Sequence, residues 1–319
     1  MSRALAVLLL GLAVMSLSCN PRKNKPSSSP ESGNLTVYCA ESASMVVTKL
    51  ASHFMALYTK AQIKVVPVPS RVAMEELLNG KTILAVTSVP FGQDELAAMK
   101  KYKIKVDSVR VALDGVAVIV NSKNPVSRLN TNQLRGIFDG RINSWHQIDN
   151  AYFGKIIPAL EDPNSGTLEY FKNRVLDGKN YGEAYPCTTM AKVYKFVAGN
   201  EEAIGLVSTD WFANGKDSLS TTTEPPKALE IAEVDSSAKI YVNPNTFGSY
   251  YYPYQAHIGR HYYPLTRAIY FMTRDFNFGL GAGFLTYVAS AQGQQVILDN
   301  GLVPATMPIR YVQLNNKPL

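Results

Sequence analysis

Short apolar runs alternate with amphipathic segments along most of the chain. The runs predicted as strands are four to eight residues long, and residues between them recur at helical spacing, as Val46, Leu50 and Phe54 do. This alternation is typical of α/β proteins with a mostly parallel sheet. The predicted strands are Leu35–Cys39, Ile63–Val68, Ile83–Val86, Gly115–Asn121, Ile156–Leu160, Ala203–Val207 and Leu265–Met272. The later predicted helices are Asn130–Phe138, Tyr181–Val197 and Phe284–Leu298.

Hydroxyl-bearing residues stand directly after several of these strands and before the next helix. Ser42 and Ser44 follow the first strand, Ser70 follows the second, and Thr87 and Ser88 follow the third. Each turn alone would be interpreted as a helix cap. Because the carboxyl ends of parallel strands meet at one edge of a sheet, where α/β proteins bind ligands, we expect these turns to share a cleft.

The segment Glu161–Thr167 (EDPNSGT) has the same arrangement of strand, turn and helix. Asn164 and Ser165 are natural helix N-caps, and Gly166 permits a ligand to approach the backbone closely. Backbone N–H groups at a helix start, together with the hydroxyls of Ser165 and Thr167, form an oxyanion site that needs no formal charge. We therefore expect this segment to belong to the same cleft.

The N-terminal segment is organised as a secretory leader. A basic residue precedes the apolar run Ala4–Val14, so residues 1–18 are predicted to be a signal peptide. Cys19 resembles the lipidated first residue of bacterial lipoproteins, and ordinary cleavage without lipid attachment is the alternative. Residues 19–33, rich in Ser, Pro, Lys and Asn, are predicted to form a disordered tether. We expect a periplasm-facing protein of the cell envelope, held on a membrane by its lipid anchor.

Composition excludes some classes of protein. The chain has 319 residues, of which 46% are hydrophobic, and it is long enough for two lobes. The net charge is +7, but without the first 33 residues 28 basic and 24 acidic residues remain, a net charge of about +4. We find no cluster of basic residues interleaved with aromatic ones and do not expect nucleic acid as a partner.

Cysteines and histidines indicate no cofactor chemistry. Beyond Cys19 the cysteines are Cys39 and Cys187, which we expect in different lobes as two buried thiols. The four histidines lack the spacing of a zinc site, so we expect no metal and no other cofactor.

Seven short motifs follow one another over nearly the whole mature chain: Asp114–Asn121, Lys123–Val126, Leu134–Trp145, Asp162–Thr167, Ala203–Val207, Tyr263–Arg267 and Phe284–Pro304. In this order they resemble the phosphate-binding proteins of ABC importers, members of the type II periplasmic binding-protein superfamily. The resemblance implies two α/β lobes, each a mostly parallel sheet flanked by helices, joined by crossing hinge strands. It places lobe I at residues 34–112 and 264–319, and lobe II at residues 113–263.

The resemblance also implies which residues contact the ligand. These are the hydroxyl turns identified above: Ser42, Ser44, Ser70, Thr87, Ser88, Ser165, Gly166 and Thr167. Arg71, beside Ser70, could add a positive charge, and an exposed position on its helix is the alternative.

Three positions depart from the family pattern. Glu161 stands where the signature loop normally has an arginine, and Glu41 stands where a glycine is expected. Ile83 or a neighbour takes the place of an aspartate that accepts the proton of phosphate. Because a carboxylate repels an anion that an arginine would attract, we expect these residues to alter the ligand site.

Three functions are compatible with these observations. The first is a membrane-tethered solute-binding protein that binds phosphate or a similar oxyanion in the inter-lobe cleft and delivers it to an ABC permease. The second keeps the fold but binds a non-phosphate ligand. The third is a scaffold lipoprotein that binds another envelope protein without a solute. An enzyme is not expected, because Ser165 has no adjacent histidine motif and no Gly-x-Ser-x-Gly turn.

Overall fold

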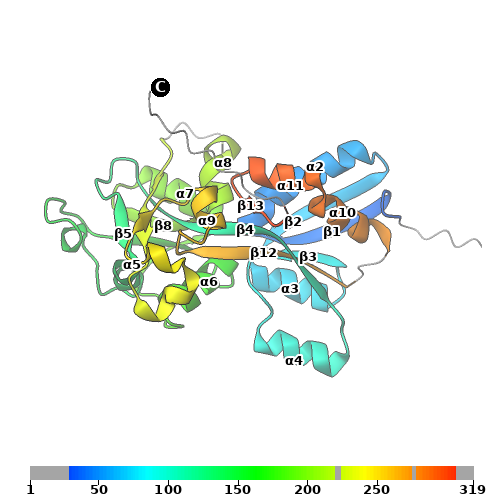
Figure 1. The fold of residues 1–319 in the computed structure, drawn as a ribbon, viewed down its shortest axis with the longest axis horizontal. Coiled ribbons are helices and arrows are strands. Elements are labelled where there is room, and N and C mark those ends of the chain that lie inside the picture. Colours follow the sequence, from blue (N-terminus) through cyan, green and yellow to red (C-terminus); the bar gives the residue numbers. More distant parts are fainter. Residues whose placement is uncertain (1–28, 220–223, 275–277, 307–319) are drawn as a thin grey trace, which may run out of the picture.

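The computed structural model describes residues 29–219, 224–274 and 278–306. These residues form two lobes that share the antiparallel strands β4 (Asp107–Val120) and β12 (Thr266–Thr273) (Figure 1). The main sheet has the strand order β2-β1-β3-β12-β4-β8-β6-β7. The predicted fold class, two α/β lobes joined by crossing strands, is confirmed.

Lobe I is built on three parallel strands at one end of this sheet. They are β1 (Gly33–Ala40), β2 (Ala61–Val68) and β3 (Leu84–Thr87). The helices are α2 (Ser44–Leu57), α3 (Ser70–Leu78), α4 (Gln93–Tyr102), α10 (Gly279–Ala289) and α11 (Ala291–Asp299).

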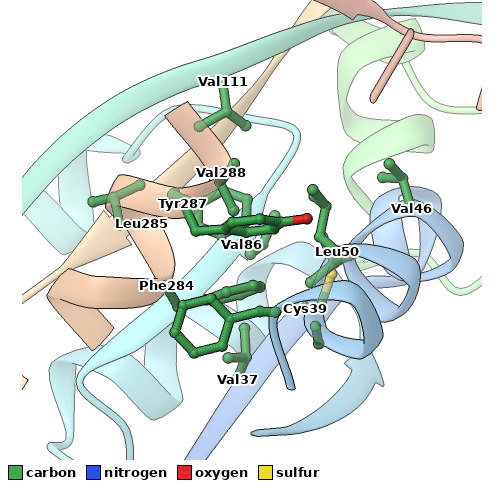
Figure 2. Packing of buried hydrophobic residues seen from close by; sticks show 14 of the residues in the cluster. Val37, Cys39, Val46, Leu50, Val86, Val111, Phe284, Leu285, Tyr287 and Val288 are labelled. Atoms are coloured by element: carbon green, nitrogen blue, oxygen red, sulfur yellow. The ribbon is translucent and has the colours of Figure 1, made fainter. Parts of the chain in front are cut away.

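The core of lobe I lies between the sheet and helices α2, α10 and α11. Phe284 and Tyr287 of α10 point toward Leu50 of α2, above Val37 and Val86 of the sheet (Figure 2). Phe54 packs edge-on against Phe284, with ring centroids 5.5 Å apart, an arrangement that aromatic pairs favour. The apolar residues of α2 recur at helical spacing because they form the face of the helix that is buried in this core.

Lobe II is built on the other end of the sheet. Its parallel strands are β6 (Ile157–Glu161), β7 (Tyr185–Thr188) and β8 (Ala203–Ser208). Its helices are α5 (Thr131–Phe138), α6 (Gly166–Val175), α7 (Met190–Gly199), α8 (Thr209–Leu219) and α9 (Gln255–Gly259). A small sheet contains β5 (Arg128–Asn130), β10 (Glu230–Ala232) and β11 (Tyr250–Tyr251), while β9 (Lys227–Ala228) and β13 (Val303–Pro304) pair with β4.

Two predicted helices differ from the structure. The segment Tyr181–Val197 contains the short strand β7 before α7, so its first half was wrongly predicted as helical. The segment Phe284–Leu298 is divided between α10 and α11, because Ser290 ends α10 and its hydroxyl accepts a hydrogen bond from Gly293 N at the start of α11. Helix α4 was not predicted at all.

The two cysteines of the folded region lie in different lobes. Cys39 and Cys187 are both buried and free, and they belong to the cores of lobes I and II, respectively. The predicted signal peptide, Cys19 and the predicted tether up to residue 28 lie outside the described residues. The tether prediction is wrong for residues 29–33, because Ser29 pairs with Ser32 and Gly33 begins β1. In the part of the chain that the structure describes, no helix is long and apolar enough to cross a membrane.

Candidate functional site

Hydroxyl turns from the two lobes meet at one enclosed space between them. Ser42 and Ser70 line it from lobe I, and Ser165, Gly166 and Thr167 line it from lobe II. Ser88 Oγ adjoins this group, since it accepts a hydrogen bond from Ser42 Oγ at 3.2 Å and lies 3.4 Å from Ser70 Oγ. The structure thus brings together six of the residues selected from the sequence.

Gly166 allows the first turn of α6 to touch the serines of lobe I. A Cβ at this position would lie 2.3 Å from Ser88 Oγ and 2.4 Å from Ser70 Oγ, far inside van der Waals contact. The space that remains has about 10 Å³ available to the centre of a water-sized sphere, which corresponds to about one water molecule. A tetrahedral oxyanion is larger, so the lobes must separate to admit one.

Glu161 forms one wall of this space. Its side chain is buried, with the residue 5% exposed, and its Oε1 accepts a hydrogen bond from Ser165 Oγ at 2.8 Å. Burial raises the pKa of Glu161 to about 7, and the nearby Glu41 carboxylate also raises it, whereas Ser165 and Arg267 act in the opposite direction. Glu161 therefore changes its protonation state near neutral pH.

Glu41 joins the two lobes. It begins the short 3-10 helix Glu41–Ala43 in lobe I, and its Oε1 accepts a hydrogen bond from Met190 N, at the start of α7 in lobe II, at 3.0 Å. Burial raises the pKa of Glu41, although the α7 amides oppose this change. A carboxylate at a helix N-terminus is electrostatically favourable, so this contact stabilises the closed arrangement.

Asp210 makes the reciprocal contact from lobe II to lobe I. Its Oδ2 accepts a hydrogen bond from Val46 N, in the first turn of α2, at 3.0 Å. Burial raises the pKa of Asp210 to about 7, opposed by the bond from Val46. Each lobe thus places a carboxylate at the start of a helix of the other, and of these Asp210 is buried and Glu41 is partly buried.

Arg267 supplies a buried positive charge beside the α6 turn. Its Nε and Nη2 donate to Asp114 Oδ2 at 3.0 and 2.8 Å, and its Nη1 donates to Thr167 Oγ1 at 3.1 Å. Thr209 N and Oγ1 donate to the other oxygen, Asp114 Oδ1. Arg267 and Asp114 were not identified as site residues from the sequence. Their position inside apolar strands could have indicated a functional role, because charged residues are rarely buried unless they are paired.

Arg71 lies beside the enclosed space rather than in its wall. Its guanidinium pairs with Glu169 of α6 across the lobes, with Nε 2.7 Å from Oε2, and with Glu95 of α4 at 2.8 Å. Arg71 therefore joins the lobes and does not replace the missing arginine next to the serines.

Three other selected residues lie away from the wall. Ser44 Oγ donates to Glu41 O, and Thr87 Oγ1 donates to Val89 O, so both hydroxyls satisfy local backbone groups. Ile83 precedes β3, at the opposite end of the strand from Thr87, and packs against Gly281 of α10. The expectation that Ile83 alters the ligand site is wrong, because its side chain is 38% exposed on another face of the lobe.

Comparison with known proteins assigns the chain to a protein family. A family model described as "PBP superfamily domain" matches residues 24–292. The "Phosphate-binding protein PstS" of Staphylococcus aureus (strain USA300) is 27% identical over 177 residues, 54% of each chain, so the chain spans about half the length of the curated relatives it matches.

Solved structures share the fold. A protein from Clostridium perfringens described as a "Putative Phosphate ABC Transporter Substrate-Binding Protein with Bound Phosphate" has a TM-score of 0.70 at 18% identity, and the match covers 86% of this chain and 100% of that chain. An ABC-type phosphate transport receptor from Vibrio cholerae has a TM-score of 0.61 at 20% identity and covers 85% and 100%. At these identities the likeness concerns the fold.

Proposed function

The chain belongs to the PBP superfamily, and from this premise we propose that it binds phosphate or a similar oxyanion between its lobes and delivers it to an ABC permease. The observation that carries this proposal is the convergence of Ser42, Ser70 and Ser88 with the Ser165–Thr167 turn around one enclosed space. Hydroxyls and the first amides of α3 and α6 are donors that suit an oxyanion.

Arg267 supplies part of the positive charge that an arginine at position 161 would bring to the site. Its Nη1 already reaches Thr167 Oγ1, so a positive charge stands beside the turn without belonging to it. Asp114 holds the guanidinium in place through two hydrogen bonds. When Glu161 is protonated, its carboxyl group adds no repulsion to an anion and can donate a hydrogen bond. Oxyanion binding should therefore be favoured below about pH 7.

A second candidate is a neutral or cationic solute. It is favoured by a specific observation: Glu41, Glu161 and Asp162 all line the enclosed space. With these groups ionised, the walls would attract an amine and repel an anion. A scaffold role without any solute is the remaining possibility of the same fold. Ser165 caps α6 and donates to Glu161, so we assign it a binding role rather than a nucleophilic one.

The cellular setting is also part of the proposal. Signal cleavage after residue 18 and lipid attachment at Cys19 would leave the lobes facing the periplasm on a short tether. The permease, or another envelope protein, would then meet the lobes near the membrane surface.

A thermal-shift screen at pH 6 tests the proposal. Phosphate, sulfate, other oxyanions and small amines are compared on the wild-type chain and on Glu161→Arg. A ligand at a hundredfold excess over its Kd adds about 2.7 kcal/mol of stability, which raises the Tm of a chain of this size by roughly 5 °C or more.

The outcomes separate the candidates. A rise with phosphate, larger in Glu161→Arg than in the wild type, supports oxyanion binding. A rise only with amines supports the second candidate. No rise with millimolar phosphate in either chain overturns the oxyanion proposal.

A further inference from the structure

Helix α4 projects from lobe I as an arm (Figure 1). None of its ten residues is buried, whereas helices of globular proteins usually bury an apolar stripe. Leu96 is 45% exposed and Tyr102 is 65% exposed. The first turn is held to α3 by the Arg71–Glu95 ion pair, so the basic last turn lies at the other end of the arm.

A run of lysines ends this arm. Residues 100–105 have the sequence KKYKIK, with four lysines and no acidic residue. All four lysine side chains are exposed, and among the described residues no ion pair involves any of them. Tyr102 stands between them, with Lys101 Nζ 5.1 Å from its ring centroid. The expectation that no basic cluster interleaves with aromatic residues is therefore wrong for this segment.

The helix dipole explains only part of the run. Lys100 and Lys101 lie in the last turn of α4, where positive charge is favourable. Lys103 adopts a left-handed backbone with φ of 54°, a position where glycine is usual and other residues are strained. Lys105 lies beyond the helix. The helix dipole therefore does not account for Lys105, and it does not explain why a residue other than glycine stands at position 103.

We propose that the arm, α4 with residues 100–105, docks on an anionic phospholipid surface. The exposed lysines match the phosphate groups of the lipids in charge, and Tyr102 and Leu96 match the interface between headgroups and acyl chains. The nearest acidic residues in sequence are Asp94 and Glu95 in the first turn of α4 and Asp107 after the run. Glu95 shares Arg71 with Glu169, so this group keeps one net negative charge, but it lies at the first turn of α4 and not in the lysine run.

The path of the chain agrees with this placement. The first described residues belong to lobe I, where Pro30 lies against Gly283 of α10, so the predicted lipid anchor leads to the lobe that carries α4. The ten residues 19–28 span at most about 35 Å when extended. Docking of the arm would fix the orientation of lobe I on the membrane, independently of any solute.

Vesicle co-sedimentation tests the proposal. The mature chain from residue 20 onward, which lacks both the apolar leader and the lipid-bearing Cys19, is mixed with phosphatidylcholine vesicles with and without phosphatidylglycerol, at low ionic strength. The arm variant replaces Lys100, Lys101, Lys103 and Lys105 by Gln. The control variant has the same net charge as the arm variant. It replaces four exposed lysines of lobe II by Gln, namely Lys123, Lys155, Lys179 and Lys195.

We expect binding only to the anionic vesicles, and loss of about fivefold in affinity for each lysine of the arm. The arm variant should therefore bind on the order of several hundredfold more weakly, while the control variant stays within a few-fold of the parent. Circular dichroism and Tm confirm that both variants are folded, and four single Lys→Gln variants repeat the measurement should the arm variant lose its fold.

Three results would overturn the proposal. The first is equal affinity of the arm and control variants for anionic vesicles. The second is equal binding of the parent to both kinds of vesicle. The third is displacement from vesicles by double-stranded DNA at an equal phosphate concentration, which would assign the run to nucleic acid. Displacement by millimolar inorganic phosphate is not expected, since the proposed oxyanion site lies between the lobes.

Discussion

Replacing Glu161 by Gln should remove much of the dependence of stability on pH. In the folded chain, burial raises the pKa of Glu161 from 4.5 to about 7. Below about pH 4.5 the carboxyl is protonated in both folded and unfolded chains. Between about pH 4.5 and 7 only the folded chain keeps the proton, so its stability falls as the pH rises, and above pH 7 the loss is complete.

The magnitude follows from the size of the shift. One pKa unit corresponds to about 1.4 kcal/mol, so the rise from 4.5 to about 7 makes ionised Glu161 cost about 3 kcal/mol of stability. Most of this cost, roughly 2 to 3 kcal/mol, develops between pH 5 and pH 8. A glutamine side chain has the same shape but cannot ionise, so the Glu161→Gln variant should escape the cost.

Urea unfolding at pH 5 and pH 8, followed by the fluorescence of Trp145 and Trp211, measures this effect. The free energy of unfolding of Glu161→Gln relative to wild type should rise by roughly 2 to 3 kcal/mol between the two pH values. The exposed Glu183→Gln variant is the control and should show no such change. A difference between Glu161→Gln and wild type that is the same at both pH values would refute the reasoning.

Three further predictions concern the contacts around the cleft. Arg267→Met leaves Asp114 buried without its partner and should lower the free energy of unfolding by about 3 to 5 kcal/mol; an unfolding midpoint in urea equal to that of the wild type would contradict this. Asp210→Asn should reduce the pH dependence that remains in Glu161→Gln, because burial raises the pKa of Asp210 to about 7 as well; the double variant tests this, and an unchanged slope would exclude it. Arg71→Gln breaks two partly exposed ion pairs, the inter-lobe pair with Glu169 and the pair with Glu95, and should cost about 1 to 2 kcal/mol, a loss that high salt reduces; a loss of equal size at high salt would argue against surface ion pairs.

Much of the fold and part of the site could be predicted from local patterns. Strands followed by hydroxyl residues and helices predict where parallel strands end, and this correctly brings Ser42, Ser70 and Ser88 together with the α6 turn. The prediction succeeds because the carboxyl ends of such strands share an edge of the sheet. The prediction for Ile83 failed because this residue lies before β3 and not after it.

Contacts between distant segments could not be predicted. The contacts Glu41–Met190 and Asp210–Val46 join residues 149 and 164 positions apart, and no local pattern links a carboxylate to the start of a remote helix. Arg267 and Asp114 stand in neighbouring antiparallel strands, yet only the register of those strands shows that they pair. The raised pKa of Glu161 likewise depends on burial between lobes.

Titration calorimetry with phosphate at pH 6 tests most directly whether the enclosed space is the oxyanion site. Wild type is compared with Gly166→Ala, whose added Cβ would lie 2.3 Å from Ser88 Oγ and 2.4 Å from Ser70 Oγ in the closed arrangement. We predict saturable binding of one phosphate per wild-type chain and a large loss of affinity in Gly166→Ala, with circular dichroism showing that the variant is folded. Absence of saturable binding to wild type, or equal affinity in both chains, would contradict the proposed site.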